Sequence, residues 1–520
     1  MQFEPSKYEK LIDEFGLKQT WINLLATRIK FSGEKFEYIL KNDLFKKAKY
    51  LEEDYLMGLS IGEISVVYEY SVAYVDVSSR KSNGQFFTPD DVSNLMVQQT
   101  LDFPVGKWLD PCSGIGNLSW HLVNAQKEKE EFLKKYLTLS DRDELALIIA
   151  RVLFTISFQE KRENLYNEIE QCFQVFDFLS VSDNGGNDLF SESTLGLIPK
   201  HDFVIVNPPY LSIKGEDPRF ETAKSRDLYA YFLENIIKTS TGFVSVTPQS
   251  FTNASKFREL RLLLMETYPL IKIFAFDNIP GNIFYGVKYG SSNSNTANSM
   301  RAAIMVARKG DGEHQITSLL RWRTSERQSL FSSLDKFLAK TEFSGDFFPK
   351  VSSVFSPLYK GMKSKPKLDS IIAPQETKYA LYIPASPRYF IPALKKPVSR
   401  ASLKTLYFNS ASDMNRAYLL INSSLMYWWW RVRDGGMTLS LETIKSLPMP
   451  DFEVDSKLVR ELEKSESSNL VYKLNAGALH ENVKHDQSLV MKLNDLILPR
   501  FSNRLILTHE NSELVQLKRK

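Results

Sequence analysis

The residues with the most specific chemical meaning are Asn207-Pro208-Pro209-Tyr210, which follow the apolar segment 203–206. Two successive prolines remove two backbone donors and stiffen the turn, so nearby carbonyl groups are not drawn into local hydrogen bonds. The side-chain oxygen of Asn207 and the carbonyl oxygen of Pro208 then remain as two rigid acceptors. Such a pair can hold both N–H hydrogens of an exocyclic amine, which makes the nitrogen a better nucleophile towards an electrophilic methyl group. Tyr210 adds a flat face on which a base can stack.

A second segment with chemical meaning, residues 110–117 (Asp-Pro-Cys-Ser-Gly-Ile-Gly-Asn), follows a predicted strand and opens a predicted helix. Glycine lets a backbone approach a ligand closely at the carboxyl end of the first strand, the ligand crevice of open α/β sheets. A dinucleotide fingerprint is excluded because position 119 is Ser119 and not a third glycine, and a phosphate loop is excluded because Gly-Lys-Ser/Thr is absent. The acidic Asp110 suits a ligand with an amino group and a positive sulfonium, such as S-adenosylmethionine.

Acidic residues also follow the next two predicted strands. Asp141 is placed to accept hydrogen bonds from both hydroxyls of a ribose. Asp177 could accept from an adenine amino group while Phe178 packs against the ring. The alternative role for an acid at such a position is a helix N-cap, which suits Asp143. Three acidic strand ends in succession nevertheless favour a single ligand that contains adenosine.

Three patterns along the chain indicate the elements that position these residues. Residues 1–80 space their apolar side chains by threes and fours, which predicts helices. From 86 to 308, short β-branched and aromatic segments alternate with helical ones, which favours a mostly parallel sheet with helices on both faces. Within this part, 145–158 predicts a buried helix, and 288–300, rich in Ser, Asn and Gly, predicts a mobile loop.

The C-terminal part is irregular up to about residue 454 and helical in pattern after that. The similar segments 470–475 and 489–494 are both expected to be amphipathic helices. The 520 residues are therefore expected to form four parts, in line with their length. These are a helical region (1–80), an α/β catalytic domain (81–310), a further domain (311–454) and a helical segment (455–520).

Charge is distributed unevenly over these parts. The net charge is only +4, but residues 351–450 contain fourteen Lys or Arg and five Asp or Glu, a net of +9. The rest of the chain therefore sums to −5. A strongly basic block in a slightly acidic protein suggests that one domain binds a polyanion, and an ordinary solvated surface is the alternative.

Cysteine content and hydropathy exclude several classes of protein. Cys112 and Cys172 alone cannot form a disulfide scaffold or a four-cysteine zinc site, and they fit a reducing cytoplasm. We expect no metal site. The segment 1–10 lacks the apolar core of a signal peptide, and no stretch approaches the ~18 uninterrupted apolar residues of a membrane helix. We therefore expect a cytoplasmic protein with no membrane contact.

Together, these motifs resemble those of the γ-class N6-adenine DNA methyltransferases of type II restriction-modification systems, the Asn-Pro-Pro-Tyr family. In that arrangement a cofactor region precedes the catalytic region, and a target-recognition domain follows. The resemblance covers residues 80–308 and implies a Rossmann-like seven-stranded sheet whose last strand is antiparallel. It also implies S-adenosylmethionine as the cofactor and a target adenine extruded from duplex DNA into the pocket.

The resemblance assigns a role to each motif residue of this chain. The cofactor-binding residues that it implies are Phe87, Thr88, Pro89, Asp110, Pro111, Gly114, Gly116, Asn117, Asp141, Asp177 and Phe178. Thr88 and its neighbours would contact the methionine end. Asn207, Pro208, Pro209 and Tyr210 would be catalytic, and Tyr210 and Phe284 would cover the two faces of the extruded base.

The basic block is interpreted as a C-terminal α+β target-recognition domain. Its expected DNA contacts are Arg388, Lys395, Lys396, Arg400, Arg431 and Arg433, whereas most of the cluster Trp428–Trp430 is expected to be core. Double-stranded DNA is the expected partner, and a cognate restriction endonuclease would act on the same site. The chain is expected to be a monomer or a weak dimer.

Three other functions remain as alternatives. The chain could be the modification subunit of a type I-like system that needs a separate specificity subunit, as the helical N-terminal region would allow. It could act on glutamine in proteins or on RNA bases, because Asn-Pro-Pro-Tyr occurs in such methyltransferases as well. It could also be a non-enzymatic DNA-binding module. The large basic C-terminal block and the intact motifs favour a self-sufficient DNA methyltransferase.

Overall fold

The computed structural model describes residues 4–75, 88–158, 164–181, 197–284, 300–387, 389–400, 402–434, 436, 438–475 and 478–515. The expected loop 288–300 lies almost wholly outside these residues. The chain divides into two compact units. The first comprises Met1–Phe251, Ser255–Ile273 and Ile283–Glu313, and the second comprises Thr252–Ala254, Phe274–Asn282 and His314–Lys520.

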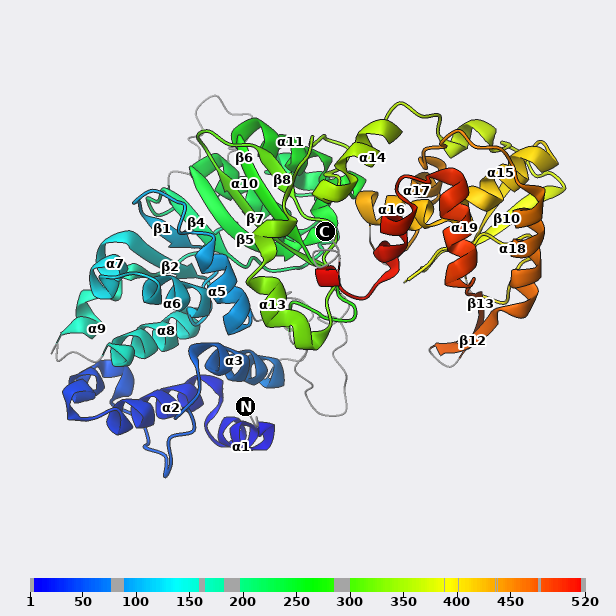
Figure 1. The fold of residues 1–520 in the computed structure, drawn as a ribbon. Coiled ribbons are helices and arrows are strands. Elements are labelled where there is room, and N and C mark those ends of the chain that lie inside the picture. The colour runs from blue at the N-terminus through cyan, green and yellow to red at the C-terminus, as the bar shows by residue number, and fades with distance from the viewer. Residues whose placement is uncertain are drawn as a thin grey trace. The chain divides into compact units, whose positions relative to one another are not determined.

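The first unit is built on a mostly parallel sheet (Figure 1). Its strands are β1 (Trp108–Asp110), β2 (Leu137–Asp141), β3 (Phe173–Val175), β4 (Phe203–Val206), β5 (Gly242–Pro248), β6 (Leu270–Ala275) and β7 (Ala302–Arg308). They are seven neighbouring strands of a nine-stranded sheet, in the order β3-β2-β1-β4-β5-β7-β6, so the sheet has two strands more than expected. The pairs from β3 to β5 are parallel, and β7 is antiparallel to β5. This confirms the predicted α/β fold with an antiparallel last strand.

Helices pack on the sheet and connect its strands. They are α5 (Asp90–Gln98), α6 (Asn117–Asn124), α7 (Lys129–Tyr136), α8 (Glu144–Ser157), α9 (Leu165–Glu168), α10 (Leu228–Thr239) and α11 (Arg258–Thr267). All four residues of β4 are buried. This is typical of apolar parallel strands that helices cover on both faces. The predicted buried helix 145–158 is α8, which begins after Asp143 because this carboxylate accepts from the backbone N–H groups of Leu145 and Ala146.

The N-terminal residues are helical, as expected, and belong to the same unit. Helices α1 (Pro5–Phe15), α2 (Leu17–Phe31) and α3 (Ile61–Val75) precede the sheet. α2 packs on α8 and α3 packs on α6. Trp21 is fully buried and meets the ring of Tyr68 edge to face at 5.2 Å. Apolar burial therefore joins these helices to the sheet domain.

The second unit combines short strands with helices. Its strands are β8 (His314–Ile316), β9 (Ala339–Lys340), β10 (Tyr379–Pro384), β11 (Leu403–Phe408), β12 (Leu470–Asn475) and β13 (Ala478–Val483). Its helices are α13 (Arg327–Phe331), α14 (Ser356–Met362), α15 (Ala411–Asn422), α16 (Ser424–Arg433), α17 (Leu441–Lys445), α18 (Ser456–Ser468), α19 (Gln487–Ile497) and α20 (Ser502–Leu505). Trp428, Trp429 and Trp430 on α16 are all buried in its core, which confirms their predicted role.

One predicted helix of this unit is wrong. Residues 489–494 do lie in α19, but 470–475 form strand β12, which pairs with β13 as an antiparallel hairpin. Leu470, Tyr472 and Leu474 alternate along this segment, so its six residues fit the period of a strand as well as that of a helix. Tyr472 and Leu474 are exposed, so no buried helix face existed to decide between the two patterns.

A buried ionic cluster lies in the second unit. The carboxylate of Asp277 pairs with Arg321 at 3.0 Å and with Arg431 at 3.2 Å, and Arg431 also pairs with Glu513 at 3.2 Å. All four side chains are at most 7% exposed. The expectation that Arg431 contacts DNA is therefore wrong, because its guanidinium already neutralises two buried carboxylates.

Substituting Arg431 with Met should strongly destabilise the second unit, because it leaves Glu513 as a buried charge without its ion-pair partner. The expected loss is about 3–5 kcal/mol in the free energy of unfolding. Urea unfolding followed by tryptophan fluorescence measures it, since Trp322 and Trp428–Trp430 are four of the seven tryptophans and lie in this unit. The exposed Lys396→Met is the matched control and should change the same free energy by less than about 0.5 kcal/mol. Equal stability of the two variants would contradict this role.

Candidate functional site

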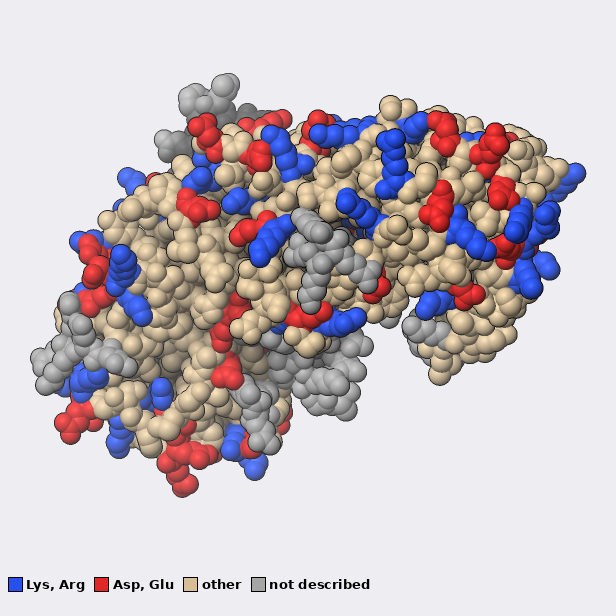
Figure 2. All heavy atoms as spheres, viewed as in Figure 1, with Lys and Arg blue, Asp and Glu red and all other residues tan. Residues whose placement is uncertain are grey.

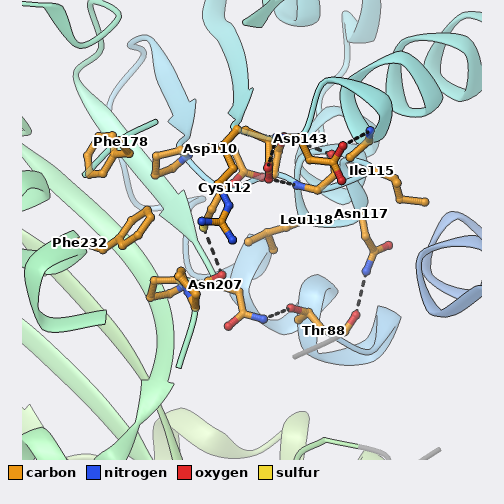
Figure 3. Close-up of a pocket in the computed structure, with 18 of the residues that line it drawn as sticks. Thr88, Asp110, Cys112, Ile115, Asn117, Leu118, Asp143, Phe178, Asn207 and Phe232 are labelled. Atoms are coloured by element: carbon orange, nitrogen blue, oxygen red, sulfur yellow. Dashed lines mark hydrogen bonds between the residues drawn. The ribbon is translucent and has the colours of Figure 1, made fainter. Parts of the chain in front are cut away.

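The candidate site lies where three neighbouring strands of the first unit end. β2, β1 and β4 are adjacent and parallel, and they end at Asp141, Asp110 and just before Asn207. Because the carboxyl ends of parallel strands meet at one edge of a sheet, residues far apart in the sequence converge there. They line one pocket (Figure 3). The predicted residues in its wall are Thr88, Asp110, Pro111, Gly114, Asn117, Asp141, Asp177, Phe178, Asn207, Pro208 and Pro209.

The glycine-rich loop turns sharply at the floor of this pocket. Gly114 and Gly116 have φ angles of +52° and +85°, which side chains rarely tolerate. Gly116 precedes α6, and a β-carbon there would lie 2.9 Å from the ring of Phe154, so this glycine serves packing and does not line the pocket. A β-carbon on Gly114 would meet no atom within 4 Å, so the backbone at Gly114 is open to a ligand.

Asp110 is a buried carboxylate, 1% exposed, at the end of β1. It accepts a hydrogen bond from Ser119 Oγ at 2.9 Å. Burial raises the pKa of Asp110 to about 7, and the nearby charge of Asp141 acts in the same direction. A cationic group in the pocket would favour the ionised form.

Asp141 organises the loops beside it. One of its oxygens accepts from the backbone N–H of Gly114 at 2.8 Å, and the other accepts from that of Asp143 at 2.9 Å. Burial raises the pKa of this carboxyl despite these two bonds. Asp143 is the N-cap of α8, as the alternative interpretation of this position anticipated, and it also accepts from Tyr68 Oη at 2.6 Å.

The expected adenine site lies at the next loop. Asp177 is exposed and accepts from the backbone N–H of Leu179 at 3.0 Å. Phe178 is buried and stacks on Phe232, with ring centroids 5.3 Å apart and an interplanar angle of 23°. Both rings line the pocket, so a planar ligand there would meet a fixed aromatic pair.

Asn207 is held at two points. Its side-chain nitrogen donates to Thr88 Oγ1 at 2.8 Å, and its backbone carbonyl accepts from Cys112 Sγ at 3.2 Å (Figure 3). The side-chain oxygen is the remaining polar atom of the amide. The stiff Pro-Pro turn and these two contacts together fix the orientation of Asn207.

Tyr210 and Phe284 lie next to each other, but not as a parallel pair. Their ring centroids are 6.2 Å apart and the planes are inclined by 59°. Tyr210 Oη donates to the backbone carbonyl of Val246 at 2.8 Å, and Phe284 is 2% exposed. A base cannot lie parallel to both rings in this arrangement, so stacking on both would require one ring to turn.

One wall of the pocket was not anticipated from the sequence. Ser65, Tyr68, Glu69 and Val72 of α3 line it. They are spaced by three and four residues and therefore form one face of the helix. This spacing was visible in the sequence, but it could not reveal that the face covers a pocket formed by distant strands. Cys112 was likewise missed as a contact of Asn207, although it lies inside the glycine-rich motif.

The remaining predicted site residues either lie outside the described residues or do not line the pocket. Phe87 and Arg388 lie outside the described residues, and Pro89, Tyr210 and Phe284 do not line the pocket. Among the described residues, His, Cys, Asp and Glu do not gather in groups of three or more that could hold a metal ion. Every helix of the described ranges is also too short or too polar to span a bilayer.

The expected DNA contacts differ in how accessible they are. Lys395 is half-buried and pairs with Glu463 at 2.6 Å, and Arg433 lies over the ring of Phe347 and 3.8 Å from Glu442. Lys396 is exposed. Arg400 is half-buried, and burial lowers the pKa of its guanidinium. Lys396 and Arg400 are therefore the better candidates for phosphate contacts.

Comparison with known proteins gives one family. Residues 125–284 match the Eco57I restriction-modification methylase family. This range includes Asp141, Asp177 and the Asn207–Tyr210 motif. No curated protein matches the chain in sequence.

Several solved structures are distantly similar. A DrdV–DNA complex is 15% identical with a TM-score of 0.42, and the match covers 74% of this chain and 51% of that one. A modification subunit of a putative type I restriction enzyme from Vibrio vulnificus YJ016 is 13% identical, with a TM-score of 0.35 and 62% and 64% covered. The type IIG restriction endonuclease BpuSI is 12% identical, with a TM-score of 0.42 and 99% and 78% covered. The chain thus spans only about half to two thirds of the length of the first two.

The family match covers the strands and loops that carry most of the site. It includes the ends of β2 and β4, and the structure adds the glycine-rich loop from the preceding strand β1. Residues 125–284 are therefore similar to the Eco57I restriction-modification methylase family.

Proposed function

We propose that the chain is a site-specific DNA adenine N6-methyltransferase of a restriction-modification system, with S-adenosylmethionine as methyl donor and protection from a cognate endonuclease as its role. The observation that carries the proposal is the position of Asn207-Pro208-Pro209-Tyr210 at the end of β4. There Asn207 and Pro208 line the pocket that also holds Asp110 and the glycine-rich loop.

The lining of the pocket suits this cofactor in charge and hydrogen-bonding groups. Gly114 leaves its backbone open to a ligand, and Asp110, Asp141 and Asp177 are carboxylates in the pocket wall. Such a wall suits a ligand that carries an ammonium group and ribose hydroxyls. S-adenosylmethionine, when bound, supplies an electrophilic methyl group on a positively charged sulfur. Asp110 would hold its amino end, and Phe178 and Phe232 would pack against its base.

The chain's own residues would prepare the target nitrogen. Asn207 Oδ1 and the carbonyl oxygen of Pro208 accept the two N–H groups of the adenine N6, which raises the nucleophilicity of its lone pair. Because the acceptors are fixed before the substrate arrives, little reorganisation is needed during transfer. Unstacking the target base from the duplex costs a few kcal/mol. Stacking of the base on Tyr210 offsets about 1–3 kcal/mol of this cost.

Residues of the second unit would supply DNA recognition. Figure 2 shows Lys and Arg side chains gathered over α14, with acidic side chains among them. Three lysines of the basic block 351–450 pair with acidic residues outside it. The pairs are Lys363 with Glu342, Lys365 with Asp451 and Lys395 with Glu463. The effective positive charge is therefore smaller than the count of +9 suggests, and exposed cations such as Lys396 would carry more of the binding.

Purified protein with isotope-labelled S-adenosylmethionine and unmethylated DNA should yield N6-methyladenine at one short sequence, detected by nucleoside mass spectrometry. Asn207→Ala should lower the rate by about 10²–10³-fold, the range for removing one preorganised hydrogen-bonding group. Its affinity for S-adenosylhomocysteine should stay close to that of the wild type. Full activity of the variant would refute the catalytic assignment. Label that appears in DNA only after a second protein is added would instead favour a modification subunit.

Cofactor affinity should depend on pH through Asp110. Its pKa of about 7 means that the carboxyl is mostly protonated below pH 7, and the ammonium group of a ligand must displace this proton. The dissociation constant for S-adenosylhomocysteine should therefore rise about tenfold from pH 8 to pH 6. Calorimetry in two buffers of different ionisation enthalpy should detect proton release at pH 6. Asp110→Asn should bind more weakly, without pH dependence and without proton release; unchanged behaviour would exclude this role.

DNA binding should weaken steeply as salt increases, whereas cofactor binding should change little. Each phosphate contact contributes about 0.9 to the slope of log K against log salt. Substituting both Lys396 and Arg400 with Gln should therefore lower the slope by about 1–2. Arg433→Gln, whose guanidinium lies over Phe347, serves as the comparison and should lower it less. Fluorescence anisotropy with a labelled duplex measures the slope for the wild type and both variants. An unchanged slope in the double variant would contradict the assignment of Lys396 and Arg400 as phosphate contacts.

A further inference from the structure

We propose that Thr88 is a positioning residue, which fixes the side-chain amide of Asn207 in the orientation that methyl transfer requires. This inference rests on the proposed function and assigns to that site a residue whose hydroxyl acts through another side chain. Thr88 was expected only as a contact of the cofactor's methionine end.

The contact itself is short and partly buried. Asn207 Nδ2 donates to Thr88 Oγ1 at 2.8 Å, and Thr88 is only 7% exposed (Figure 3). Because the nitrogen end of the amide points at Thr88, the oxygen end is directed elsewhere. This is the end that must accept from the adenine amine.

Asn207 needs such an anchor because its amide can rotate. The last side-chain torsion of asparagine has a broad energy profile. Its two ends have similar shapes but opposite hydrogen-bonding roles. An inverted amide would bring its NH₂ group against the NH₂ group of the adenine, donor against donor. A displaced amide would also lose the geometry on which preorganised stabilisation depends.

Thr88 is well placed to hold the amide because it is itself anchored. Its backbone carbonyl accepts from Asn117 Nδ2 at 2.8 Å, and the same nitrogen contacts Ser93 Oγ at 3.2 Å. Asn117 is the first residue of α6, directly after the glycine-rich loop. Thr88 therefore links the cofactor loop to the catalytic asparagine.

The backbone of Asn207 is held by a residue of the glycine-rich loop. Cys112 Sγ donates to its carbonyl at 3.2 Å. Burial and the neighbouring charge of Asp110 raise the pKa of the Cys112 thiol, so this thiol keeps the proton that it donates. Two segments that frame the cofactor pocket thus hold the side chain and the main chain of Asn207.

The test compares three threonine variants in the full-length protein. Thr88→Val keeps the shape of the side chain but removes the acceptor, whereas Thr88→Ser keeps the hydroxyl. Thr100→Val is the matched control, since its buried hydroxyl donates to the carbonyl of Val97 within its own turn. Steady-state methylation of DNA gives kcat and KM, and calorimetry gives the affinity for S-adenosylhomocysteine.

Thr88→Val should lower kcat about tenfold, the value of one hydrogen bond, while its affinity for S-adenosylhomocysteine stays within about twofold. Thr88→Ser should recover most of the lost kcat, and Thr100→Val should keep the wild-type kcat. A wild-type kcat in Thr88→Val would overturn the inference. A loss of S-adenosylhomocysteine affinity that accounts for the whole defect would also overturn it, because Thr88 would then act as a cofactor contact. Absence of methylation by the wild type would instead refute the proposed function.

Discussion

The adjacency of β2, β1 and β4 in one parallel sheet is the constraint on which the site depends. Parallel strands end on the same side of the sheet. The side chains that follow them are therefore brought within reach of one ligand although they are far apart in the sequence. Asp110, Asp141 and Asn207 come from positions up to 97 residues apart and face one pocket. Each of them is then oriented by its own hydrogen bonds. Asp110 bonds to Ser119, Asp141 bonds to the backbone of Gly114 and Asp143, and Asn207 bonds to Thr88.

Collecting carboxylates in a buried pocket has an energetic cost that the fold must offset elsewhere. Burial disfavours the charged forms of Asp110 and Asp141. The charge of Asp141 adds to this effect at Asp110, and the charge of Asp143 adds to it at Asp141. Backbone N–H groups compensate Asp141, whereas Asp110 has Ser119 as its side-chain donor. A cationic group in the pocket would offset part of this cost.

Much of this arrangement could be predicted from local sequence. Strand ends and loop motifs are short-range patterns, so the sheet, the glycine turn and the Asn207 motif were all recognisable. Partners far away in the sequence were not. In the sequence, Arg431 resembles a DNA contact because it lies among other basic residues. The acids that pair with it, Asp277 and Glu513, lie 154 and 82 residues away. The strand 470–475 was missed because six residues fit both periods, and the α3 wall because helix packing on a distant pocket has no local signature.

The hydrogen bond between Tyr68 and Asp143 has a consequence for how this protein can be shortened. Tyr68 belongs to an N-terminal helix that lies outside the family match, yet it bonds to the residue that caps α8. Its ring also packs against Trp21, on the helix that covers α8. A chain that begins at residue 81 would lose one wall of the pocket and expose apolar surface on α8 to water. The smallest unit that folds around this pocket therefore includes the N-terminal helices.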